Sequence, residues 1–185
     1  YADDLYRWYK GGKINTAYLA LDLHVNNGRG QQPALIYDSP VTGTKKTFTY
    51  TQLLHEVSLF AGVLTSLGVR KGDTIVIYMP MVPEAVIGML ACARIGAVHS
   101  VVFGGFAAHE LAIRINDARP KYILMGSGGK EIDRVIPYKP IVNAALDEAY
   151  FKPEGCIVLQ RDFVPCEMTP GFDLDWYDLV SKASP

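Results

Sequence analysis

Two adjacent glycines, Gly104 and Gly105, are the clearest sign of a binding site in this sequence. They follow a β-branched run that ends at Phe103, and a helical pattern begins directly after them. In open parallel α/β sheets, ligands bind beyond the carboxyl ends of the strands, where loops and helix N-termini present free N–H groups. A glycine pair in this place either forms a tight turn or lets a ligand lie against bare backbone. The stretch matches neither GxGxxG nor a Walker A loop, so both interpretations stay open.

The other polar residues show no spacing typical of metal binding or nucleophilic catalysis. The histidines His24, His55, His99 and His109 are scattered, and we expect His55 and His109 to face solvent. No HExxH motif and no GxSxG elbow is present. Residues 127–134, SGGKEIDR, lack the GxxxxGK[ST] pattern, so a polar connection after a strand is expected there. We therefore predict no catalytic residue and no metal site in this chain.

Composition and charge are those of an ordinary globular domain. The chain has 185 residues, 49% of them hydrophobic and 20% charged, with a formal net charge of −1. This charge provides no field that would recruit nucleic acid, and no stretch reaches the roughly 20 apolar residues of a membrane span. The cysteines Cys92, Cys156 and Cys166 are odd in number and show no metal-binding spacing, which favours free thiols in a reducing compartment. We expect no nucleic-acid or membrane partner.

Apolar runs alternate with helical patterns from residue 74 onward. Because nearly continuous apolar strands separated by helices indicate a sheet covered on both faces, we predict parallel strands and intervening helices over residues 74–125. A short helix is predicted within DLDWYDLV. The predicted strands are 74–79, 98–103, 121–125 and 155–160. One helix is predicted to begin at Pro83, and two more are predicted at about 107–118 and 140–150.

A hairpin and an amphipathic helix are predicted ahead of this alternation. Two short strands, about 34–37 and 46–49, flank a turn-rich loop. Thr49 and Gln52 have the spacing of a capping box, and apolar residues then recur at helical intervals up to a stop at Gly68. Residues 1–32 show no sustained period, so an irregular N-terminal wrap is expected.

The sequence resembles the short-chain acyl-CoA synthetases, which are the acetyl- and propionyl-CoA synthetases of the adenylate-forming superfamily. The match is very close over GVRKGDTIVIYMPMVPEAVIGMLACARIGAVHSVVFGGFAAHELAIRI. WYKGGKIN and LDLH are similar to the family's N-terminal cap segment, and ALIYDSPVTGTKKTFTYTQL is similar to its entry into the adenylating domain. DSPVTGT and RVIPYKPIVNAAL favour the propionyl-CoA branch. The resemblance covers essentially the whole chain. It implies an α/β fold with a mostly parallel sheet and helices on both faces, preceded by an irregular cap segment and a β-hairpin.

This resemblance implies a two-step ligase whose substrates are a short-chain carboxylate, ATP with Mg²⁺, and CoA. The carboxylate attacks ATP to give an acyl adenylate and pyrophosphate, and the CoA thiol then displaces AMP. In that family a strand-end Phe-Gly-Gly forms part of the surface that receives the adenosine end of CoA, and Phe103, Gly104 and Gly105 match it one for one. Acetate or propionate is the expected acid.

An arginine after the next strand meets CoA phosphates in the family, and Arg134 matches it. The position three residues earlier is arginine in many acetyl-CoA synthetases but is Glu131 here, an acid where phosphate prefers a base. Arg134 could instead pair with Glu131 or Asp133 on the same loop. Both roles stay open at this point.

The resemblance also predicts how the chain is organised. Residues 1–33 would form the cap segment, and residues 34–185 the N-terminal, incomplete part of the AMP-binding domain. We expect this fragment alone to be inactive, because the family's phosphate loop, acyl pocket and lysine-bearing C-terminal lid would lie further along the same polypeptide, its expected partner. The expected location is the cytoplasm or the mitochondrial matrix. One alternative is a non-catalytic CoA- or nucleotide-binding module. Another, a dinucleotide-binding oxidoreductase, is disfavoured because no GxGxxG opens the first βα unit.

Overall fold

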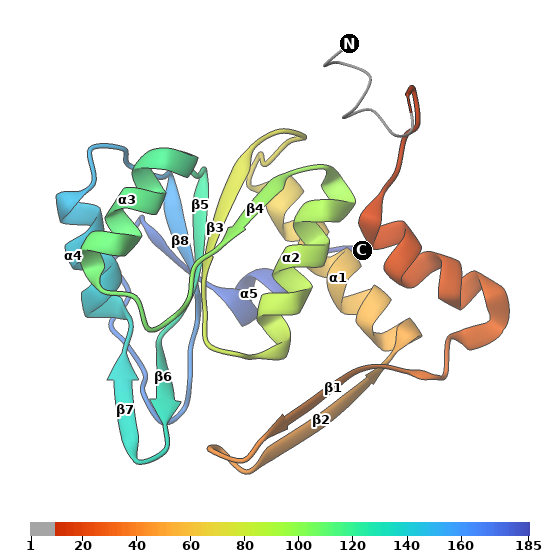
Figure 1. Cartoon of the computed structure of the whole chain (residues 1–185), viewed down its shortest axis with the longest axis horizontal. Coiled ribbons are helices and arrows are strands. Elements are labelled where there is room, and N and C mark those ends of the chain that lie inside the picture. Colours follow the sequence, from red (N-terminus) through yellow and green to blue (C-terminus); the bar gives the residue numbers. More distant parts are fainter. Residues whose placement is uncertain (1–9) are drawn as a thin grey trace.

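A five-stranded sheet forms the centre of the fold in the computed structural model, which describes residues 10–185 (Figure 1). The first nine residues of the predicted cap segment lie outside the described residues. The strand order is β4-β3-β5-β8-β9, and every neighbouring pair is parallel. The strands are β3 (Thr74–Tyr78), β4 (Val98–Val101), β5 (Tyr122–Gly126), β8 (Gly155–Leu159) and β9 (Asp173–Asp175). The predicted parallel arrangement over residues 74–125 is confirmed.

Helices cover both faces of this sheet, as predicted. Alternate side chains of a strand point to opposite faces, so each central strand contributes to two cores. On β3, Ile75 and Ile77 pack against one helix pair, whereas Val76 and Tyr78 pack against the other. The first pair is α1 (Tyr50–Ser66) and α2 (Pro83–Ile95), joined by α5 (Trp176–Ser181); the second is α3 (Ala108–Ala118) and α4 (Lys139–Glu148).

The predicted start of α1 is confirmed in detail. The Gln52 backbone N–H donates to Thr49 Oγ1 at 3.2 Å, and the Thr49 backbone N–H donates to Gln52 Oε1 at 2.9 Å. This reciprocal capping box satisfies two N–H groups at the helix start. The hairpin ahead of it, β1 (Pro33–Ser39) paired with β2 (Thr44–Thr49), is confirmed as well.

The prediction for residues 127–134 is wrong, because a second hairpin stands where a polar connection was expected. It pairs β6 (Gly128–Glu131) with β7 (Arg134–Pro137) in antiparallel fashion, and only Ile132 and Asp133 separate the two strands. Both faces of its outer part are exposed, so the sequence shows no alternation of apolar and polar residues there. The hairpin projects beyond the carboxyl end of β5 (Figure 1).

The prediction of an irregular wrap before the hairpin is also wrong for the described residues. Two short π-helical segments, η1 (Tyr18–Asp22) and η2 (Val25–Arg29), lie there and run beside α1. Leu21 is buried in the core, and the Arg94 guanidinium donates to both carboxylate oxygens of Asp22 at 2.8 and 3.1 Å. Packing on α1 and this ion pair with α2 therefore stabilise helical turns that the local sequence pattern does not favour.

The three cysteines are free thiols with different exposures, which predicts different reactivities. Cys92 and Cys156 are buried, and burial raises the pKa of each thiol to about 12. Because the thiolate is the reactive form, neither should react with iodoacetamide at pH 8 while the chain is folded. We expect slow modification of the half-buried Cys166 alone, and modification of all three in denaturant. Peptide mass spectrometry measures this, and labelling of native Cys92 as fast as Cys166 would contradict it.

Candidate functional site

The loop that carries the glycine pair lies beyond the end of an edge strand. β4 ends at Val101, two residues earlier than predicted, although the Val102 backbone N–H still donates to Ile77 O at 2.9 Å. Val98 and Val101 are more than half exposed, because β4 has a neighbour on one side only among the described residues. The helices that cover both faces of the sheet therefore leave much of this edge strand exposed. Phe103 stands on the loop rather than in the strand.

Phe103 offers an open aromatic surface on this loop. Its side chain is 68% exposed, and its ring contacts the Phe106 ring edge to face at 5.8 Å between centroids. Aromatic rings of this kind stack well on flat ligands such as adenine. The loop thus presents an aromatic contact surface at the carboxyl edge of the sheet.

Close approach, rather than an unusual backbone angle, explains the two glycines. Neither has a positive φ. A Cβ built on Gly104 would lie 2.6 Å from the Tyr138 hydroxyl oxygen, and one built on Gly105 would lie 2.6 Å from the Phe103 ring. Both distances are shorter than real Cβ contacts, so a side chain at Gly104 would clash with the buried Tyr138, and one at Gly105 would displace the exposed Phe103 ring. The glycine pair therefore serves close packing of the loop against these two rings.

Arg134 stands on the outer part of the β6–β7 hairpin, at the same edge of the sheet. It is exposed and directly opposite Glu131 in the antiparallel register. Residues opposite each other in such a ladder have Cβ atoms about 4.5–5.5 Å apart, so the carboxylate of Glu131 is within reach of the guanidinium. Arg134 is two residues further toward the hairpin tip than Ile136, which pairs with Gly129, and this is roughly 7 Å along the strand.

Tyr138 connects the loop and the hairpin. Its hydroxyl oxygen, which is close to Gly104, would also lie only 2.5 Å from a Cβ built on Gly129 in β6. The structure therefore places Phe103, Gly104 and Gly105 beside the base of the hairpin, with Arg134 toward its outer end. Sequence reasoning missed Tyr138, because its contacts come from segments far apart in the chain and no local motif marks it.

The ionisable groups of this edge are suited to binding rather than to proton transfer. Burial and then the neighbouring Tyr138 raise the pKa of the Tyr78 phenol to about 12. Burial and then the charge of Glu131 raise the pKa of Tyr138, while the Arg161 cation lowers it. Both phenols are therefore protonated at neutral pH. Arg161, which the sequence did not single out, lies close by, and its backbone N–H donates to Ser127 Oγ at 2.8 Å.

The two histidines predicted to face solvent lie on α1 and α3. His55 is exposed, and so is His109, which pairs with Glu148; that hydrogen bond raises the pKa of His109. Over residues 10–185, His, Cys, Asp and Glu side chains form no group of three or more that could hold a metal ion. In the same part of the chain, no helix has the length and apolar character needed to cross a membrane.

Comparisons with known proteins bear on this site. A family model described as "AMP-binding enzyme" matches residues 23–179. The chain is 56% identical over 183 residues to an uncharacterised protein of Pseudomonas aeruginosa, covering 99% of this chain and 29% of that protein. It is 49% identical to the mitochondrial acyl-CoA synthetase short-chain family member 3 of Homo sapiens, covering 96% of this chain and 26% of the relative.

The fold is also similar to that of a solved structure. The acetoacetyl-CoA synthetase from Streptomyces lividans superimposes with a TM-score of 0.80 at 26% sequence identity, over 93% of this chain and 26% of that one. The chain therefore spans between a quarter and a third of the length of the proteins that it matches.

Proposed function

Because this chain belongs to the AMP-binding enzyme family, we propose that it forms part of an ATP-dependent short-chain acyl-CoA ligase. Such an enzyme joins a carboxylate to AMP with release of pyrophosphate, and the CoA thiol then displaces AMP to give the thioester. The names of the relatives and the likeness to an acetoacetyl-CoA synthetase support this reaction class. ATP, with its Mg²⁺, and CoA are substrates in this proposal, and acetate or propionate is the acid.

The contribution of this chain is part of the CoA surface. Phe103 supplies the aromatic contact for an adenosine group, while Gly104 and Gly105 let the loop pack closely against the Tyr138 phenol and the Phe103 ring, so this ring stays at the surface. Arg134 supplies a guanidinium for a phosphate of the same ligand. The observation that carries the proposal is the exposed Phe103 ring beside the glycine pair, at the edge from which the hairpin bearing Arg134 projects (Figure 1).

The rest of the reaction is assigned to the remainder of the same polypeptide. In this proposal residues 1–33 form the cap segment, and residues 34–185 belong to the adenylation domain. The phosphate loop, the acyl pocket and the C-terminal lid are its partners, in the cytoplasm or the mitochondrial matrix.

Replacement of Arg134 by Ala in the full-length protein tests the phosphate contact. A charge-assisted contact of this kind contributes roughly 1.5–3 kcal/mol, so the apparent Michaelis constant for CoA should rise about ten- to a hundredfold. Acyl-adenylate formation does not involve CoA, so carboxylate-dependent pyrophosphate exchange into ATP should be unchanged. Both are measured for wild type and Arg134→Ala.

Arg70→Ala is the matched control, because Arg70 is also an exposed loop arginine but lies ahead of the amino end of β3. Its apparent constant for CoA should equal that of wild type. If Arg134→Ala leaves the apparent Michaelis constant for CoA unchanged, Arg134 does not belong to the CoA surface. Its role would then be limited to pairing with Glu131.

A further inference from the structure

Tyr138 is enclosed between the two segments of the proposed CoA surface. Its side chain is 6% exposed, and it lies between the end of β7 and the start of α4. Its hydroxyl oxygen occupies the space where a Cβ of Gly104 or of Gly129 would be, at 2.6 and 2.5 Å respectively. One phenol therefore fills the gap between the loop and the base of the hairpin.

The Tyr138 ring is held rigidly in this position. Its backbone N–H donates to Ser127 O at 2.9 Å, and its ring lies 5.0 Å from the Tyr78 ring at an angle of 48°. Tyr78 belongs to the central strand β3 and is fully buried. The Tyr138 ring therefore packs against a buried side chain of the central strand β3.

Tyr78 completes a second contact with the same loop. Its hydroxyl donates to the backbone oxygen of Phe106 at 2.8 Å. The loop from Phe103 to Phe106 is thus touched at Gly104 by one phenol and held at its far end by the other. The hairpin is touched at Gly129 by the first phenol only.

From these contacts we propose that Tyr138 is a positioning residue, which sets the Phe103–Phe106 loop at a constant separation from the β6–β7 hairpin. The inference rests on the proposed function, because it makes the fit of CoA to Phe103 and Arg134 depend on this separation. A ligand that spans two segments binds tightly only if both are already in place, and a buried ring with few rotatable bonds provides that order. Tyr138 itself does not touch the ligand.

Gly129→Ala in the full-length protein is the first test. Gly129 does not have a positive φ, so the added methyl acts through its clash with the Tyr138 hydroxyl. The clash should displace the hairpin from the loop and raise the apparent constant for CoA about tenfold, with pyrophosphate exchange unchanged. Gly88→Ala is the control: its Cβ would lie 2.8 Å from Leu124 Cδ1, on the other face of the sheet, and the CoA constant should stay at the wild-type value.

Removal of the hydroxyl should relieve the clash. In the Tyr138→Phe background the nearest ring atom to the new methyl is 3.0 Å away, which is close but no longer a severe clash, so the combination of Gly129→Ala with Tyr138→Phe should recover part of the lost CoA affinity. Tyr138→Phe alone keeps the ring and should bind CoA within about threefold of wild type. Tyr138→Leu, which loses the ring, should weaken CoA about tenfold without changing pyrophosphate exchange.

The outcomes separate this inference from the proposed function. Equal CoA constants for wild type and Gly129→Ala, or failure of Tyr138→Phe to relieve Gly129→Ala, would overturn the positioning role. Should Phe103→Ala and Arg134→Ala leave the CoA constant unchanged while Gly129→Ala raises it, the assigned contacts fail and the positioning role stands.

Urea unfolding of the full-length protein provides the readout if Gly129→Ala folds poorly. Its midpoint should fall in Gly129→Ala and recover with Tyr138→Phe, and a midpoint that does not recover would overturn the contact itself.

Discussion

Lys139→Met is expected to lower the free energy of unfolding of this chain by about 3–5 kcal/mol. The Lys139 ammonium contacts Asp173 Oδ2 in the interior, where the two side chains are 7% and 0% exposed. The same carboxylate oxygen accepts a hydrogen bond from the Thr169 backbone N–H at 2.6 Å. Loss of the ammonium would leave a buried carboxylate with one backbone partner, which costs far more than the pair itself contributes. Urea unfolding followed by circular dichroism measures the change.

Two further variants make this prediction specific. Lys139→Met combined with Asp173→Leu removes both charges and should recover most of the lost stability, because apolar side chains of similar size can replace a buried pair. Lys182→Met is the matched control, since Lys182 and Asp178 form an exposed pair with side chains 69% and 58% accessible. It should change the unfolding free energy by less than about 1 kcal/mol. A cost as small in Lys139→Met would show that the interior pair is well solvated.

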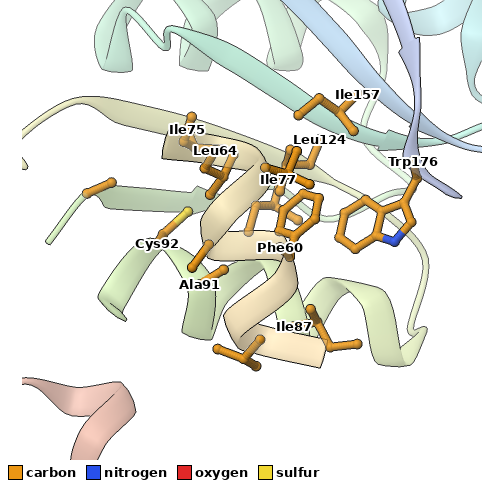
Figure 2. Packing of buried hydrophobic residues seen from close by; sticks show 14 of the residues in the cluster. Phe60, Leu64, Ile75, Ile77, Ile87, Ala91, Cys92, Leu124, Ile157 and Trp176 are labelled. Carbon is orange, nitrogen blue, oxygen red and sulfur yellow. The ribbon is translucent and has the colours of Figure 1, made fainter. Parts of the chain in front are cut away.

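Phe60→Ala is expected to destabilise the chain by about 3–5 kcal/mol, as is usual for removal of a large ring from a close-packed core. Figure 2 shows Phe60 on α1 facing the indole of Trp176, and the two rings stack at 3.7 Å with an angle of 15° between their planes. Both side chains are buried. Removal of the Phe60 ring would leave a cavity between α1 and α5 and weaken their contact. The amides of α5 should therefore lose protection from hydrogen exchange first.

The midpoint of urea unfolding and the exchange rates of α5 amides test this expectation. His55→Ala is the control, because His55 lies on the exposed face of the same helix, and its midpoint should match wild type. A shift in Phe60→Ala no larger than that of His55→Ala would mean that the stacked rings add little to the packing of α5.

The buried ion pair also connects stability with the candidate site. Lys139 is the first residue of α4 and follows Tyr138 directly. The contact with Asp173 therefore fixes the backbone from which the Tyr138 ring projects between the loop and the hairpin. A chain weakened at Lys139 should hold the two segments of the proposed CoA surface less firmly.

The sequence by itself determined the elements whose signals are local. Continuous apolar runs predicted β3, β5 and β8, because strands covered on both faces cannot place polar side chains on either one. The spacing of Thr49 and Gln52 predicted the start of α1, since a capping box closes within one turn. The glycine pair after Phe103 marked the candidate site, because close backbone approach requires glycine whatever approaches it.

Tertiary contacts decided the parts whose stabilising partners lie far along the chain. The helical turns before β1 depend on Asp22 meeting Arg94, and the outer part of the β6–β7 hairpin is exposed on both faces, so neither shows a period. Tyr138 lies between the Gly104 loop and the hairpin, which come from segments that are separate in the sequence. Local patterns record which face of an element is buried. Which distant side chain fills a gap between two elements is settled only when the whole core packs, because many sequences fit the same pattern but one arrangement fills the space.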